Sequence, residues 1–401
     1  MRQRYSLIPV YALLAGFCHA AAAFADQPLA TSYNGFAFKL LNQLVKEQPS
    51  TNISISPYSV ATALQVVENG AAGKTKTEMQ QILGTNGLLS ADVNAANKEI
   101  AQSLMNGNAN VTLIIANAIW YRSGVPVKPA FIAATKQFYD AEVSALNFAD
   151  PHSVDVINEW ASDKTQGKIR RMADGMIDPT DTRLFLADAV YFKGKWTSPF
   201  AVKETKNRPF YLRGGGQKMI PMMTQTRTLA YRQGSGYQAV RLPYVGENLA
   251  MYVFLPDSGS SPENILGTLS GDTWQRDIKP GFRSTEGTIV LPKFMIEYSV
   301  ELKRPLQSLG MKAAFDPSTA DLSGIGAGLF ISAARQKTFV EVNEEGTEAA
   351  AVTGVGVSLT ALKRPATPFQ MIVDRPFLFM IEDRRTRTVL FVGVLFDPQS
   401  G

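Results

Sequence analysis

The sequence of 401 residues is poor in the side chains that carry most hydrolytic and metal-binding chemistry. It has one cysteine, Cys18, and two histidines, His19 and His152. A single cysteine excludes an internal disulfide, and the one histidine that would remain after removal of residues 1–25 excludes a multi-histidine metal site. Because Cys18 and His19 lie in an N-terminal segment that reads as removable, a Ser-His-Asp triad would have only His152 available. We therefore expect no catalytic residues, no bound metal and no cofactor.

The N-terminal segment resembles a secretory signal. Arg2 and Arg4 form a basic end, and the apolar residues 6–17 are too few to span a bilayer. Ala23-Phe24-Ala25 then fits the small-x-small cleavage pattern, so we predict cleavage after Ala25 and a secreted or periplasmic protein. The alternative is a buried N-terminal helix. No later stretch is long and apolar enough to cross a membrane, so we expect no membrane partner.

The chain also lacks an excess of charge. Removal of residues 1–25 takes away two basic and no acidic side chains, which leaves 38 Lys and Arg against 35 Asp and Glu, a net charge of +3. So small a charge gives no electrostatic footprint for nucleic acid. Internal repeats, low-complexity tracts and long linkers are missing too. We therefore predict one continuous domain over residues 26–401.

The early part of the chain has apolar residues at helical spacing. Residues 36–44 place phenylalanine and leucine on one face of a helix. Ser56 before Pro57 predicts the N-cap of a second helix. Thr75 and Glu78 predict a capping box for a third, which ends at Gly84.

Later segments are apolar or alternate with period two, as strands do. They cover residues 111–121, 183–192, 249–255, 288–296 and 388–396. Strands and helices do not alternate strictly, which predicts an α+β protein with large sheets. Asp188 stands out because it lies midway along an apolar strand, in register with four apolar residues. A buried carboxylate must be paired, hydrogen-bonded or protonated, and a structural role is favoured over catalysis.

Residues 344–364 carry the most informative pattern, EEGTEAAAVTGVGVSLTALKR. From Thr347 onward, alternate residues fall into two sets, one able to be buried and one small or polar. The first set is Thr347, Ala349, Ala351, Thr353, Val355, Val357 and Leu359; the second is Glu348, Ala350, Val352, Gly354, Gly356 and Ser358. Glycines and an alanine run weaken any strand, so the segment is able to be loop or strand. A plain β-hairpin arm is the alternative.

Together with motifs elsewhere in the chain, this segment makes the sequence similar to the serpin family. The hinge motif within EEGTEAAAVTG resembles the inhibitory pattern of that family. Further similar motifs follow in the family's order over most of the chain. They are NISISPYS (52–59), INEW (157–160), TQGKI (165–169), YFKGKW (191–196), LPY (242–244), LPKF (291–294), FVEVN (339–343) and DRPFLFMI (374–381).

The resemblance implies an α+β serpin fold with three β-sheets, eight or nine helices and an exposed reactive-centre loop at about 344–368. It also implies a suicide inhibitor rather than an enzyme, most simply a monomer. In the family, a target serine protease cleaves the loop and is held as an acyl-enzyme while the loop inserts into the main sheet. The alternative is a non-inhibitory serpin that acts as a carrier, chaperone or storage protein.

The resemblance also assigns the reactive loop. The hinge residues are Glu344, Glu345, Gly346, Thr347, Glu348, Ala349, Ala350, Ala351 and Val352. Counting sixteen residues beyond Glu344 places the reactive bond at Thr360-Ala361. The alternatives are Leu359, Leu362 and Lys363. Small and aliphatic residues around this bond indicate an elastase-like or subtilisin-like target, while a trypsin-like or a cysteine protease stays open.

The resemblance places a sheet-opening region elsewhere in the chain. Its residues are Ser56, Ser59, Asp188, Trp196 and Gln336. Asp188 and Gln336 stand where the family usually has asparagine and histidine, and we predict that they hydrogen-bond to each other near the two serines. Pro305 follows Tyr298 where a helix is expected, and predicts a kink in that helix.

Overall fold

The structure is a computed structural model that describes residues 22–105, 110–345 and 367–398. The hinge beyond Glu345 and the predicted reactive bond at Thr360-Ala361 lie outside these residues, so their assignments stay predictions. Most of the predicted signal segment lies outside as well. The first helix, α1, begins at Ala22, ahead of the predicted cleavage site.

Within the described residues there are eight α-helices and one π-helical turn. They are α1 (Ala22–Glu47), α2 (Pro57–Glu68), α3 (Gly73–Leu83), α4 (Ser90–Met105), α5 (Pro129–Tyr139), α6 (Ser153–Lys164), α7 (Pro262–Leu266), α8 (Lys303–Ser308) and η2 (Thr273–Ile278). None of the helices in this part of the chain has the length and hydropathy of a membrane span. As predicted, Ser56 is the N-cap residue of α2 and Gly84 ends α3 with a left-handed backbone, φ 70°.

Two predictions for these helices are wrong. Helix α3 already begins at Gly73, so Thr75 lies inside it rather than at its N-cap. Thr75 Oγ1 accepts a hydrogen bond from the backbone N of Asp321, and Glu78 caps a different segment by accepting from the backbone N of Lys312. Pro305 lies in the first turn of α8, where a helical amide has no intrahelical acceptor, so it fits without breaking a hydrogen bond.

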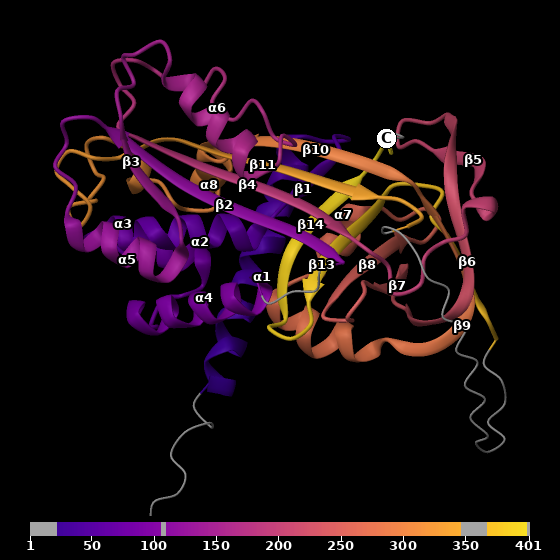
Figure 1. The fold of residues 1–401 in the computed structure, drawn as a ribbon. Helices are drawn as coiled ribbons and strands as arrows, with labels where there is room; N and C mark the ends of the chain where they lie inside the picture. Colours follow the sequence, from indigo (N-terminus) through magenta and orange to yellow (C-terminus); the bar gives the residue numbers. More distant parts are fainter. Residues whose placement is uncertain (1–21, 106–109, 346–366, 399–401) are drawn as a thin grey trace, which may run out of the picture.

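The strands form two hydrogen-bonded sheets in the described residues (Figure 1). The five-stranded sheet has the order β10 (Phe294–Glu301), β11 (Ile331–Val342), β4 (Leu184–Gly194), β2 (Val111–Arg122) and β3 (Glu142–Leu146). The nine-stranded sheet has the order β1 (Ile53–Ile55), β14 (Thr388–Leu395), β13 (Phe377–Asp383), β8 (Leu249–Pro256), β7 (Tyr237–Pro243), β6 (Gln217–Gln233), β9 (Arg283–Pro292) and β12 (Phe369–Ile372), with β5 (Lys206–Tyr211) paired to β6. The family's three sheets appear as two networks because the 17-residue β6 pairs with β5, β9 and β7 along its length.

One predicted strand is two. Residues 288–296 divide at Lys293 between β9 of the nine-stranded sheet and β10 of the five-stranded sheet. Pro292 closes β9, and the backbone N of Lys293 donates to Pro221 O (3.0 Å), outside either ladder. Both halves are strand-like, so the apolar pattern alone does not show the change of sheet.

The five-stranded sheet is covered on both faces. Helix α6 lies over one face and α2 lies under the other (Figure 1). Along β4, the odd residues Phe185, Ala187 and Ala189 pack in the cluster that contains Trp160 of α6. The even residues of β4 face the main core: Leu184, Leu186, Val190 and Phe192. Asp188 belongs to this even set, as predicted, and therefore points toward α2.

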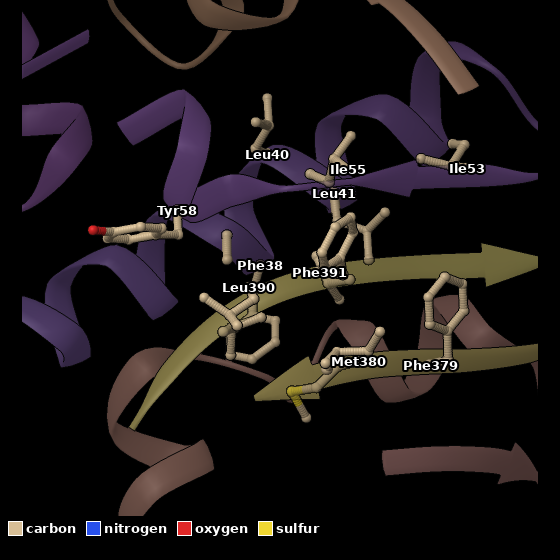
Figure 2. Packing of buried hydrophobic residues seen from close by; sticks show 14 of the residues in the cluster. Phe38, Leu40, Leu41, Ile53, Ile55, Tyr58, Phe379, Met380, Leu390 and Phe391 are labelled. Carbon is tan, nitrogen blue, oxygen red and sulfur yellow. The ribbon is translucent and has the colours of Figure 1, made fainter. Parts of the chain in front are cut away.

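The main core packs α1 and α2 against the nine-stranded sheet, of which β1 is the edge strand. Figure 2 shows side chains of α1 and β1 lying over those of β13 and β14. Those labelled there are Phe38, Leu40, Leu41, Ile53, Ile55, Tyr58, Phe379, Met380, Leu390 and Phe391, and each is at most 3 % exposed. Phe36, Leu40, Leu41 and Leu44 thus form the buried helix face that their spacing predicts. This core fixes α2, which carries two of the predicted site residues.

Candidate functional site

Strands β4 and β11 are paired directly and in parallel at the centre of the five-stranded sheet. The pairing runs from Ile331 opposite Leu184 to Val340 opposite Phe192. Direct hydrogen bonding over this length leaves no room for another strand between them. The chain leaves β11 at Val342 and reaches Glu344 beside the same end of the sheet. A segment that turned back from there would run antiparallel to both β4 and β11.

A cluster of polar side chains lies under the middle of the β4–β11 pair. Asp188 and Gln336 are register partners, and Gln336 Nε2 donates to Asp188 Oδ2 at 2.6 Å. Ser59 Oγ of α2 donates to the other oxygen, Asp188 Oδ1, at 2.5 Å. The predicted hydrogen bond between Asp188 and Gln336 is confirmed. We call Ser56, Ser59, Asn117, Asp188 and Gln336 the Asp188 cluster.

Gln336 also ties β11 to the start of α2. Its Nε2 donates to Ser56 O and its Oε1 accepts from Ser56 N, both at 2.9 Å. All four side-chain and backbone groups involved are buried. Gln336 therefore holds three elements together, because it bonds α2 and β4 from its place on β11.

Asp188 is a buried carboxyl that, in the part of the chain that the structure describes, is held by neutral donors rather than by a cation. Burial raises the pKa of Asp188 to about 7, and the hydrogen bonds from Ser59 and Gln336 lower it only in part. The pKa is raised because a charge in a low-dielectric interior loses its hydration. The carboxyl is therefore poised to gain or lose a proton near neutral pH.

The end of β11 where the hinge begins is held by a second group of contacts. Glu344 is 6 % exposed, and its carboxylate pairs with Lys293 Nζ at 2.8 Å. Thr205 Oγ1 donates to Glu344 Oε1 at 2.8 Å, and Phe200 N donates to Glu344 O at 2.9 Å. Burial alone would raise the pKa of Glu344, but Lys293 and Thr205 outweigh it and the pKa is lowered.

Trp196 lies at this hinge end and not in the Asp188 cluster. Its Nε1 donates to Asn343 O at 2.9 Å. Its ring stacks on Tyr244, with centroids 4.4 Å apart and planes 11° apart. The predicted sheet-opening residues thus divide into two places, four under the middle of the β4–β11 pair and Trp196 at its end.

Sequence reasoning missed several partners in both places. Asn117 is the register partner of Asp188 on β2, and its Nδ2 donates to Thr62 Oγ1 at 3.2 Å. Like Asp188, Asn117 is a polar residue in an apolar strand, and that signal could have found it. Lys293 stands in the motif LPKF, whereas nothing in the sequence around Thr205 marks it as a partner of Glu344.

Comparison with known proteins identifies the family. The chain matches the family described as Serpin (serine protease inhibitor) over residues 31–398. An uncharacterized serpin-like protein of Thermococcus kodakarensis is 34 % identical over 384 residues, covering 94 % of this chain and 87 % of the relative. The leukocyte elastase inhibitor of Bos taurus is 34 % identical over 384 residues, covering 93 % of this chain and all of the relative. The crystal structure of native protease nexin-1 with heparin is similar with a TM-score of 0.81 and 32 % identity, over 92 % of this chain and 100 % of that chain.

The chain belongs to the serpin family, and its α+β serpin fold is confirmed. Members of this family are protease inhibitors by description. The sheet that serpins open is the five-stranded sheet, and here its β4 and β11 are paired directly. The Asp188 cluster holds the middle of this pair, and the contacts of Glu344 and Trp196 hold its end.

Proposed function

We propose that the chain is a suicide inhibitor of serine proteases whose cleaved loop inserts between β4 and β11. The observation that carries this proposal is the direct parallel pairing of β4 and β11, from whose end the hinge sequence departs at Glu344. A target protease attacks the carbonyl carbon of Thr360 with its serine Oγ. The Thr360-Ala361 peptide bond breaks, the proton of the serine hydroxyl passes through the protease's own base to the leaving amine of Ala361, and an ester joins the protease to Thr360.

Insertion then carries the esterified protease along the sheet and distorts its active site, so that the ester is not hydrolysed. The inserted residues would run antiparallel to β4 and to β11. One parallel ladder is replaced by two antiparallel ladders, and antiparallel pairing is slightly more stable per residue. Val355, Val357 and Leu359 would add about 1.5–3 kcal/mol each on full burial. The closed form is thus a kinetic trap, as in other strand-insertion switches.

The hinge residues suit fast insertion. Thr347 and the alanines that follow offer little steric resistance, although Val352 is β-branched and slows entry. Bulky, charged or proline residues in the hinge would favour the alternative of a carrier, chaperone or storage serpin. Serine and aliphatic residues at 358–362 favour an elastase-like or subtilisin-like target, and the leukocyte elastase inhibitor among the relatives supports this class. Lys363 keeps a trypsin-like protease as a second target class.

A denaturing gel tests the proposal. The chain lacking residues 1–25 is mixed with pancreatic elastase, subtilisin, chymotrypsin or trypsin, and the released peptide is weighed by mass spectrometry. We expect a complex that survives denaturant and a C-terminal peptide that begins at Ala361. A peptide that begins at Thr360, Lys363 or Arg364 would move the bond to the alternative positions after Leu359, Leu362 or Lys363. Cleavage with every protease left active would contradict inhibition of these four.

Two neighbouring hinge variants sharpen the test. Thr347→Arg puts a charged side chain in the set that must be buried, so we expect cleavage without a stable complex. Glu348→Arg adds the same side chain to the solvent-facing set and should keep the complex. Loss of the complex in both variants, or in neither, would contradict the assigned alternation.

We also propose that the protein is exported, on the strength of the signal-like residues 1–25. The N-terminus of protein recovered from the expressing cells is read in the same preparation. Asp26 is the expected first residue, and retention of Met1 would contradict export through this segment.

A further inference from the structure

Asp188 lies at a place in the β4–β11 pair where opening must break a buried side-chain hydrogen bond as well as the ladder. Its two oxygens accept from Ser59 on α2 and from Gln336 on β11. If β11 moves away from β4, Gln336 moves with it and the bond to Asp188 Oδ2 is lost. Ser59 lies on α2, a separate element, and its bond does not depend on β11.

The groups that face Asp188 from every neighbouring element are neutral. They are the Ser59 hydroxyl from α2, the Gln336 amide from β11 and the Asn117 amide, its register partner on β2. On α2, burial keeps the pKa of Tyr58 far above its ordinary value, so its phenol stays neutral. On β4, Ala187 and Ala189 flank Asp188. Within the described residues, the pKa of Asp188 is set by burial and by the hydrogen bonds from Ser59 and Gln336, not by a neighbouring charge.

The nearest charges on β11 lie on the other face of the sheet. Arg335 and Lys337 flank Gln336 and so point away from α2. Arg335 Nη1 donates to Met172 O and Asp174 O, and Lys337 Nζ lies 3.9 Å from Glu297. Asp188 therefore has hydrogen-bond donors in the closed sheet and no counter-charge.

We propose that Asp188 makes opening of the β4–β11 pair dependent on pH, holding it closed in acid and releasing it as the pH approaches neutrality. This inference rests on the proposed function, because it takes insertion between β4 and β11 as the event that is regulated. It goes beyond that function by assigning the control to one carboxyl group. Asn117 and Thr62 border a cavity of about 560 Å³, which brings solvent close to the cluster.

The sign follows from linkage between proton binding and opening. In the closed sheet the Asp188 pKa is raised to about 7, while water in the opened sheet returns it toward its ordinary 3.8. Protonated Asp188 stabilises the closed form relative to the open form. This stabilisation is complete below the ordinary pKa of 3.8 and is lost as the pH rises through the raised pKa of about 7. Opening therefore becomes easier by at most about tenfold per pH unit between these values and is constant above them.

Annealing of a synthetic loop peptide measures opening without a protease. A fluorescent peptide of residues 347–358 is mixed with the chain lacking residues 1–25, and its rate of incorporation is measured from about pH 5 to about pH 8.5. We expect the rate to rise at least about tenfold up to pH 7 and then to level off. Asp188→Asn keeps a side-chain oxygen that accepts from Gln336 but cannot titrate. The incorporation rate of this variant should therefore change less than about twofold over the same pH range.

Two more variants make the test specific. Glu297→Gln removes a carboxylate that is 53 % exposed on the same sheet, and should leave the wild-type profile unchanged. Ser59→Ala removes a donor to Asp188, and should move the midpoint of the profile to higher pH, which tests the role even if Asp188→Asn fails to fold.

The outcomes separate the two proposals. Equal pH profiles for wild type and Asp188→Asn, with incorporation in both, would overturn the role of Asp188 and leave insertion standing. No incorporation at any pH, in any variant, would overturn insertion and the regulation with it.

Discussion

At the scale of single residues, Glu344 and Lys293 are the pair that fixes the end of β11. Their 2.8 Å contact joins the first hinge residue to the link between β9 and β10. The pair is largely buried on the Glu344 side, where charged hydrogen bonds contribute more than at the surface. Both residues lie in motifs of the sequence, but nothing there pairs them, so the contact becomes visible only in the fold.

We predict that Glu344→Gln destabilises the chain by about 1–2 kcal/mol at pH 7. The pKa of Glu344 is lowered, so its contribution is present above the ordinary value of 4.5 and is lost as the pH falls through the lowered value. The urea midpoint of wild type and variant should differ at pH 7 and converge in acid. Glu286→Gln, an exposed site on β9, serves as the control and should match wild type at both pH values. A difference that persisted unchanged in acid would show that the charge is not the cause.

At the scale of elements, β1 and β14 approach each other so closely that only glycine fits at position 393. A Cβ there would lie 2.3 Å from Ile53 O of β1 and 2.6 Å from the Phe379 ring. Backbone cannot yield as a flexible side chain does, so the two strands would have to separate. Strand β1 leads directly to Ser56 and α2, and its position therefore bears on the Asp188 cluster.

We predict that Gly393→Ala destabilises the chain by about 1–3 kcal/mol. Gly214→Ala is the matched control, because its Cβ would meet nothing within 4 Å. Thermal unfolding followed by circular dichroism should show a lower transition for Gly393→Ala alone. Equal transitions in the two variants would mean that β1 has room to move.

The elements also show what the sequence could reveal. Period and apolar runs identified β2, β4, β8 and β14, because buried strands leave a local pattern. The position of Asp188 among the even residues of β4 predicted its side of the sheet. The division of residues 288–296 between two sheets escaped prediction, because it depends on the contact of Lys293 with Pro221 and not on local pattern. The start of α3 escaped for a similar reason, since Thr75 is engaged by Asp321.

At the scale of the whole molecule, the architecture could be predicted only through resemblance to serpins. Composition argues against disulfides and multi-histidine metal sites, but it does not pair β4 with β11, because their residues lie about 150 positions apart along the chain. The match over residues 31–398 supplies that long-range information. The polar cluster was predicted from the same resemblance, whereas the contacts of Lys293 and Thr205 with Glu344 depend on the fold.

The most direct test of the central claim is the thermal stability of the chain before and after its loop is cut. A protease that cuts near Thr360 without being trapped supplies the nicked form. If the cut loop inserts between β4 and β11, the unfolding temperature should rise by more than about 10 °C. Nicked Thr347→Arg should show no such rise, since its hinge resists burial. A nicked wild-type chain that unfolds at or below the temperature of the intact chain would contradict insertion.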